Sequence, residues 1–143
     1  MKRKNVQQSQ HLTKSELGLM EVLWESDRPL TRPEILNKAV YNRDDPLFAT
    51  NTFHVLVNSL IDKEYLTAFG GSGRGRNNAR HYAPTVTRNE YYALLICGSN
   101  HYSPSDLPDI FASLFNFSPK TDMDAVLNSM EALIREKREQ LNK

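Results

Sequence analysis

Cysteine is nearly absent from this sequence, because Cys97 is the single one among 143 residues. One cysteine can form neither an intrachain disulfide nor a cysteine-rich zinc or copper site. Long apolar runs are also missing, since no segment approaches the roughly 20 apolar residues that a transmembrane helix needs. The basic, polar start MKRKNVQQSQH is not followed by the apolar stretch of a signal peptide. These absences predict a soluble protein of the cytoplasm with no membrane partner.

Candidate metal-binding and catalytic patterns are lacking as well. The four histidines show no metal-ligand spacing on a helix face and have no acidic cluster beside them; they are His11, His54, His81 and His101. No Ser, His and carboxylate constellation or carboxylate pair stands out. We therefore expect no metal, no cofactor and no catalytic residues, and an enzyme of unknown type stays as the weakest hypothesis.

Three short amphipathic helices are predicted in the first half of the chain. Thr13 and Glu16 have capping-box spacing ahead of a first helix that should end near residue 26, with Leu17, Met20, Leu23 and Trp24 on one face. Thr31 and Glu34 repeat the spacing ahead of a second helix over about 32–41. A third helix over about 50–63 carries an apolar stripe made of Phe53, Leu56, Val57, Leu60 and Ile61. Three such helices favour a helix-turn-helix arrangement.

The outer face of the expected third helix is almost uncharged. It carries Asn51, Thr52, His54, Val55, Asn58 and Ser59, where a solvated helix usually carries Lys and Glu. Taken alone, this pattern is somewhat better explained as an uncharged solvated face. However, Asn, Ser and Thr are poor helix formers whose amides and hydroxyls match base edges and phosphates, and Val55 could meet a thymine methyl group. The basic hairpin that follows favours the interpretation of this face as a DNA-binding surface.

A basic hairpin is predicted directly after the third helix. Two short extended runs, YLTAF and RHYAP, flank the Gly-rich segment GGSGRGRNNA. This segment lacks the strand-loop-helix context of a nucleotide-binding loop. It could be a mobile loop that is basic by chance, but we favour a wing whose Arg74, Arg76 and Arg80 neutralise phosphates along a duplex. The charge distribution agrees weakly, since residues 1–84 hold 12 Lys and Arg against 9 Asp and Glu.

The remainder of the chain is predicted to be helical and self-associating. Helices are expected in NEYYALLIC, in SDLPDIFASLF and from DMDAVLN to the end. The last helix has an apolar stripe too long to leave in water. We expect a homodimer whose contacts are Phe111, Leu114, Phe115, Met123, Val126, Leu127, Met130, Leu133 and Ile134.

Together these segments predict a mostly α fold with a small β-wing. Residues 1–11 should be a flexible basic arm, residues 12–84 a winged-helix DNA-binding domain and residues 85–143 a helical dimerisation region. The expected DNA contacts are Arg32, Thr50, Asn51, Thr52, His54, Val55, Asn58, Arg74, Arg76 and Arg80. The predicted function is a sequence-specific DNA-binding transcriptional regulator. The alternative is a winged-helix protein-protein interaction module without DNA specificity, which would not show steep salt dependence.

The chain resembles a known family, the penicillinase and methicillin-resistance repressors that are grouped with copper-responsive repressors. The resemblance lies in LTKSELGLMEVLW, NTFHVLVNSLIDKEYL and RHYAP, and more weakly in SLFNF and the terminal helix. It implies a dimeric winged-helix repressor that binds a palindromic operator in double-stranded DNA. The chain departs from the family at Glu64, where a small turn residue is usual. It also lacks the paired Cys motifs that end the copper-responsive branch, so metal sensing is not expected.

The resemblance also implies a way in which repression could end. Asn116 and Phe117 in SLFNFSPK resemble the bond at which repressors of the penicillinase branch are cut by a membrane sensor-protease. A simpler interpretation is that the phenylalanines of this segment only pack the dimer. Both can hold, because a cut there would separate the terminal helix from the DNA-binding part.

Overall fold

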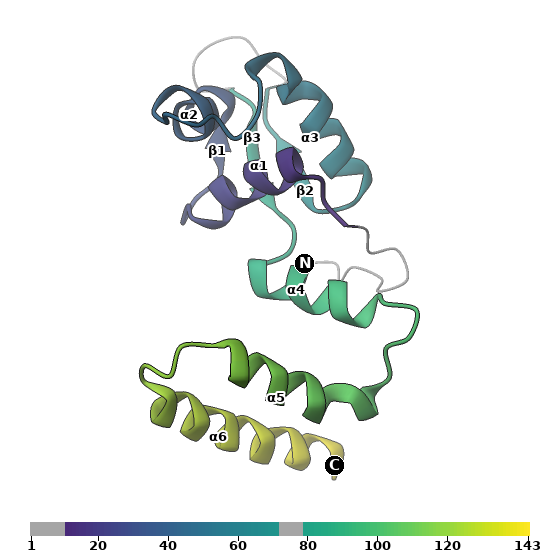
Figure 1. Ribbon diagram of the computed structural model, residues 1–143. Coiled ribbons are helices and arrows are strands. Elements are labelled where there is room, and N and C mark those ends of the chain that lie inside the picture. Colours follow the sequence, from purple (N-terminus) through teal and green to yellow (C-terminus); the bar gives the residue numbers. More distant parts are fainter. Residues whose placement is uncertain (1–10, 72–78) are drawn as a thin grey trace. The chain divides into compact units, whose positions relative to one another are not determined.

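The computed structural model describes residues 11–71 and 79–143 (Figure 1). The chain divides into two compact units, Met1–Tyr102 and Ser103–Lys143. The first unit extends beyond residue 84, where the sequence pattern placed the end of the winged helix. The helix that follows the wing, α4 (Arg88–Cys97), belongs to the first unit.

The first two helices begin at the predicted capping boxes. At the start of α1 (Lys14–Trp24), the Thr13 hydroxyl accepts from the Glu16 backbone N–H at 3.2 Å, and the Glu16 carboxylate accepts from the Thr13 N–H at 2.9 Å. In α2 (Arg32–Leu36), the Glu34 carboxylate accepts from the Thr31 N–H at 2.9 Å. These bonds satisfy backbone donors that the first helical turn leaves without partners.

The second and third helices change their winding within the predicted ranges. After Leu36 the chain continues as a π-helical turn, η2 (Asn37–Tyr41). A 3-10 turn, η3 (Thr50–Thr52), precedes α3 (Phe53–Asp62). The predicted extents are thus confirmed, but the hydrophobic period does not distinguish these windings over a single turn.

A small antiparallel sheet completes the winged helix. β2 (Leu66–Phe69) and β3 (His81–Pro84) pair as the predicted hairpin, with Phe69 opposite His81. β1 (Leu30–Thr31) pairs with the other edge of β3, giving the order β1-β3-β2. The sequence analysis did not predict β1, because two residues are too few to show an alternating pattern.

The core lies between the three helices and the sheet. The stripe of α3 is confirmed, since Phe53, Leu56, Val57 and Leu60 are buried and Ile61 is partly buried. On α1 the buried surface is wider than predicted, because Leu19 and Val22 are buried together with Met20 and Leu23. One charged residue also lies inside, Glu16, which is 2% exposed.

The turn from α3 into β2 uses a left-handed backbone conformation. Glu64 has φ 66°, a conformation that costs most residues energy and that glycine adopts easily. The turn places Tyr65 at 0% exposure and lets the Tyr65 N–H bond to the Leu60 carbonyl at 2.9 Å. The departure from the family pattern at Glu64 therefore falls on a position where glycine would cost less energy.

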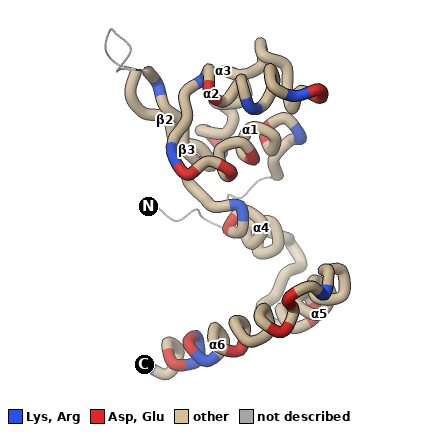
Figure 2. Tube along the Cα trace, turned by 90° about the vertical axis from the view of Figure 1, so that its left-hand side faces the viewer, with Lys and Arg blue, Asp and Glu red and all other residues tan. Residues whose placement is uncertain are grey.

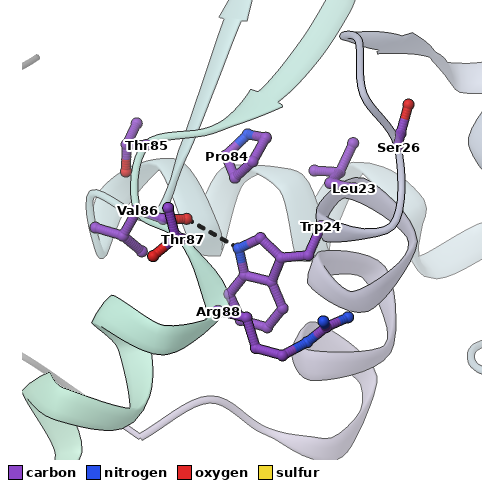
Figure 3. A pocket seen from close by; sticks show the side chains of 8 residues that line it. All are labelled: Leu23, Trp24, Ser26, Pro84, Thr85, Val86, Thr87 and Arg88. Atoms are coloured by element: carbon purple, nitrogen blue, oxygen red, sulfur yellow. Dashed lines mark hydrogen bonds between the residues drawn. The ribbon is translucent and has the colours of Figure 1, made fainter. Parts of the chain in front are cut away.

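Helix α4 is docked onto the winged helix by aromatic contacts. Tyr91 is 4% exposed and meets Tyr65 edge-to-face at 5.5 Å between ring centroids. The Leu12 N–H donates to the Tyr91 hydroxyl at 3.2 Å. At the start of α4, the Trp24 indole N–H bonds to the Val86 carbonyl in a pocket that Arg88 also lines (Figure 3). These contacts explain why α4 is part of the first unit.

The second unit consists of a 3-10 turn, η5 (Pro104–Asp106), and two helices, α5 (Leu107–Phe117) and α6 (Met123–Leu141). The chain reverses direction between α5 and α6 (Figure 1). Both helices were predicted, and neither contains a buried residue. Acidic and basic residues are both present along the end of α6 (Figure 2). Several large apolar side chains on both helices are exposed.

Candidate nucleic-acid interface

The η3 turn and the outer face of α3 carry the uncharged side chains that the sequence singled out. Asn51, His54 and Asn58 are exposed, and Val55 is 69% exposed. Thr50 and Thr52 are half-buried, and the Thr52 hydroxyl donates to the Ala49 carbonyl at 2.6 Å. The exposed groups are amide, imidazole and aliphatic groups, a combination that can bond base edges and contact thymine methyl groups in a major groove.

Ser59 differs from this expectation, because it is not simply part of the outer face. Its hydroxyl donates to the Glu16 carboxylate at 2.5 Å, and the side chain is only partly exposed. The sequence pattern could not show this, since Ser59 lies between the buried stripe and the exposed face of the helix. At such a position, the residue that packs beside it determines whether the side chain is buried or exposed.

A basic side chain lies at the start of α3. The guanidinium of Arg32, the first residue of α2, lies over the Phe53 ring at 5.4 Å from the ring centroid. Phe53 is in turn held edge-on by Tyr82 of the sheet, at 5.5 Å between ring centroids. Stacking on a ring orients a guanidinium and leaves its N–H donors available to a phosphate.

A second basic side chain lies at the neck of the wing. The Arg80 guanidinium is 6.0 Å from the Tyr82 ring centroid. Gly70 and Gly71 turn the chain here with φ of +80° and +77°, and a Cβ on Gly71 would meet the Arg80 Cβ at 3.1 Å. Glycine is therefore required at this turn for the backbone to lie against Arg80. Arg74 and Arg76, the other predicted wing contacts, lie outside the described residues.

Arg32 and Arg80 differ from Arg28 in their partners. Arg28 forms an ion pair with Glu34, which lowers the pKa of the Glu34 carboxyl to about 2 and raises the pKa of Arg28. Within residues 11–71 and 79–143, neither Arg32 nor Arg80 pairs with a carboxylate. Their charge is available to an external anion.

An aromatic pair at the wing neck was not singled out by the sequence analysis. Phe69 and His81 stack with ring centroids 5.9 Å apart and planes 16° from parallel. Phe69 is 49% exposed. The available signal was the aromatic residue that ends YLTAF, Phe69, and the histidine in second place in RHYAP, His81, because hairpin pairing brings such positions together.

The predicted dimer contacts lie on the second unit. Leu114, Leu133 and Ile134 are 57%, 49% and 53% exposed. The other residues of this set are exposed or partly exposed: Phe111, Phe115, Met123, Val126, Leu127 and Met130. Asn116 and Phe117 end α5, and Phe117 is 91% exposed.

Other types of site are not evident in the part of the chain that the structure describes. No group of three or more His, Cys, Asp or Glu residues there could hold a metal ion. No helix among these residues is long and apolar enough to cross a membrane. The pocket of Figure 3 is lined by residues from α1, β3 and the start of α4, and none of the predicted DNA contacts lines it.

The geometry of a winged helix with a polar third helix and basic flanks can be compared with known families. The model of the penicillinase repressor family matches residues 12–125, which include all of the described winged helix and α5. The chain belongs to the penicillinase repressor family. Membership makes it a DNA-binding transcriptional repressor. No curated protein matches the chain.

Proposed function

We propose that the protein is a homodimeric repressor that binds a palindromic operator and reads it with α3. The observation that carries this proposal is the uncharged, exposed face of α3, which has a basic side chain near its start. Asn51, His54 and Asn58 can bond base edges, while Arg32 bonds phosphate. Its place of action is the cytoplasm.

Arg80 extends the proposed phosphate contacts to the wing. Its guanidinium has no acidic partner among the described residues, and the Gly70–Gly71 turn packs against it. Each phosphate that is neutralised releases condensed counterions, so these contacts supply affinity without sequence choice. Arg74 and Arg76 are proposed to act in the same way.

The second unit is proposed to form the dimer interface. Neither α5 nor α6 buries a residue in the single chain, and their large apolar side chains face solvent. Burial against a second copy would remove this apolar surface from water. A two-fold dimer places two copies of α3 on half-sites whose centres lie about 10 base pairs apart or a multiple of it.

Selection of bound sequences from a random duplex pool tests the proposal. A motif with two-fold symmetry, confirmed by gel-shift competition with unrelated DNA, is the expected result. Recovery of unenriched sequences, with binding that hardly changes with salt, would instead favour the interaction-module alternative. A motif without symmetry would contradict the dimer while leaving the role of α3 in place.

We further propose that a cut between Asn116 and Phe117 by a sensor-protease ends repression. The bond lies at the end of α5, where both residues are exposed. Such a cut separates α6 from the first unit, so the affinity gained from dimerisation is lost.

A further inference from the structure

A buried carboxylate joins the start of α1 to the end of α3. Glu16 is 2% exposed and lies in the first turn of α1. One carboxylate oxygen, Oε1, accepts from the Lys63 ammonium at 2.7 Å, and the other, Oε2, accepts from the Ser59 hydroxyl at 2.5 Å. Ser59 lies in the last turns of α3, and Lys63 is its C-terminal cap. The network therefore connects two elements that are more than 40 positions apart in sequence.

The carboxylate remains charged at neutral pH in spite of its burial. Burial alone raises the pKa of Glu16, but hydrogen bonds from Lys63, Ser59 and the Thr13 backbone lower it below its ordinary value. No buried side-chain nitrogen or oxygen in the described residues lacks a partner. The network is thus fully satisfied, which is the condition under which a buried polar group favours a single geometry.

Such a network fixes the orientation of α3 more than it stabilises the fold. A buried ion pair often gains little over a well-packed apolar group of the same volume, because desolvation offsets the attraction. The apolar stripe of α3 holds the helix on the core, but hydrophobic contact is non-directional and permits small rotations and shifts. Hydrogen bonds resist such movements, because they weaken when their length or angle leaves a narrow range.

The residues near Ser59 on α3 show which side chains depend on the orientation of the helix. Val55 precedes Ser59 by one helical turn, and Asn58 is its immediate neighbour. Both are exposed on the outer face, so a rotation of α3 that breaks the Ser59 bond moves both side chains. At the opposite end, Phe53 is held by Tyr82 and Arg32. The Glu16 network is the corresponding anchor at the C-terminal end.

We propose that Glu16 is a positioning residue for sequence reading, which fixes the rotation of α3 through Ser59 and Lys63 so that Val55 and Asn58 meet base edges. This inference rests on the proposed role of α3. It predicts that loss of the network weakens binding to the operator more than binding to unrelated DNA, since phosphate contacts tolerate a small rotation better than base contacts do.

The test compares the Ser59→Ala and Glu16→Gln variants with the wild-type chain. The quantity measured is the ratio of affinities for the selected operator and for an unrelated duplex of equal length. The salt concentration is fixed, and the temperature is one at which circular dichroism shows every protein folded. In both variants we expect the ratio to fall about tenfold, as for a lost base contact, with affinity for unrelated DNA nearly unchanged.

Two further variants separate positioning from stability. Val22→Ala removes buried carbon from α1 without removing a hydrogen bond, and we expect it to lower the unfolding midpoint but not the ratio. Ser59→Thr keeps the hydroxyl and should restore most of the ratio. If Glu16→Gln does not fold, the comparison of Ser59→Ala with Ser59→Thr tests the inference by itself.

Two results would overturn the inference. One is a ratio in Ser59→Ala equal to that of the wild type, and the other is a ratio that falls equally in Ser59→Ala and Ser59→Thr. Both leave the proposed function intact, because the wild-type chain still prefers its operator. A wild-type chain without any preference among duplexes would overturn the proposed function and this inference together.

Discussion

The indole N–H of Trp24 donates a hydrogen bond to the backbone carbonyl of Val86 at 2.9 Å (Figure 3). The Arg88 guanidinium carbon lies over the same indole, 5.7 Å from the ring centroid. Two nitrogens of this guanidinium donate to one oxygen of the Glu21 carboxylate, at 2.7 and 3.1 Å. The end of α1 is thereby fixed to the connection between β3 and α4. These contacts hold the start of α4 against the winged helix.

Replacing Trp24 with Phe should destabilise the protein. The substitution keeps an aromatic ring but leaves the Val86 carbonyl without its donor, at a cost of about 1 to 3 kcal/mol in the free energy of unfolding. Urea denaturation followed by circular dichroism measures the loss. Tyr92→Phe, at a side chain that is 48% exposed, serves as the control and should change little. Equal stability of the Trp24 variant and the wild type would contradict the role of this bond.

Replacing Glu64 with Gly should stabilise the protein. Glu64 has φ 66°, and the left-handed conformation costs a non-glycine residue roughly 1 to 2 kcal/mol. The greater freedom of glycine in the unfolded chain offsets part of this gain, so a net increase of up to about 1 kcal/mol is expected. Ala93→Gly, at an exposed position within α4, should instead destabilise by about 1 kcal/mol. The same sign for both variants would refute the argument.

The stability of the protein should fall in acid partly through Glu16. Its pKa is lower in the folded than in the unfolded chain, so its stabilising contribution is complete above the unfolded pKa of about 4.3. The contribution disappears as the pH falls through the lower folded value. Unfolding free energies measured between about pH 6 and pH 3 should therefore decline less in Glu16→Gln than in the wild type. Parallel curves would show that Glu16 titrates alike in both states.

Arginine and asparagine substitutions should separate affinity from sequence choice. Arg80→Ala should weaken binding to all duplexes and reduce the salt slope by about 0.9 per lost phosphate contact, and Arg74→Ala and Arg76→Ala should act similarly. Asn58→Ala should instead change the preference among sites, by about 1 to 3 kcal/mol if a bidentate base contact is lost. Competition gel shifts at several salt concentrations measure both. Identical behaviour of the arginine and asparagine variants would contradict this division.

A chain truncated after Asn116 should lose its advantage on a palindrome. The truncation removes α6 but retains the first unit, which ends at Tyr102. We expect a monomer in sedimentation and affinity for the palindrome close to that for one half-site. The full-length variant Leu133→Asp, which places a charge on the apolar face of α6, should behave alike. A truncated chain that binds the palindrome as tightly as the full chain would refute the dimer and cleavage proposals.

The sequence by itself determined the elements of this protein. The capping boxes at Thr13 and Thr31 predict helix starts because the bonding groups lie three positions apart on one chain. The stripe on α3 and the exposed polar face follow from the helical period in the same way. These features depend on neighbours along the chain, so the pattern of residues is sufficient to find them.

Only the tertiary structure decided how the elements are joined. Glu16 has the pattern of a capping residue, and its bonds to Ser59 and Lys63 depend on partners that folding brings beside it. Tyr91 and Trp24 likewise place α4 with the first unit although the sequence pattern divides the chain before it. The physical reason is that long-range contacts depend on packing between elements, while the periodicity of one element gives only the face that it buries.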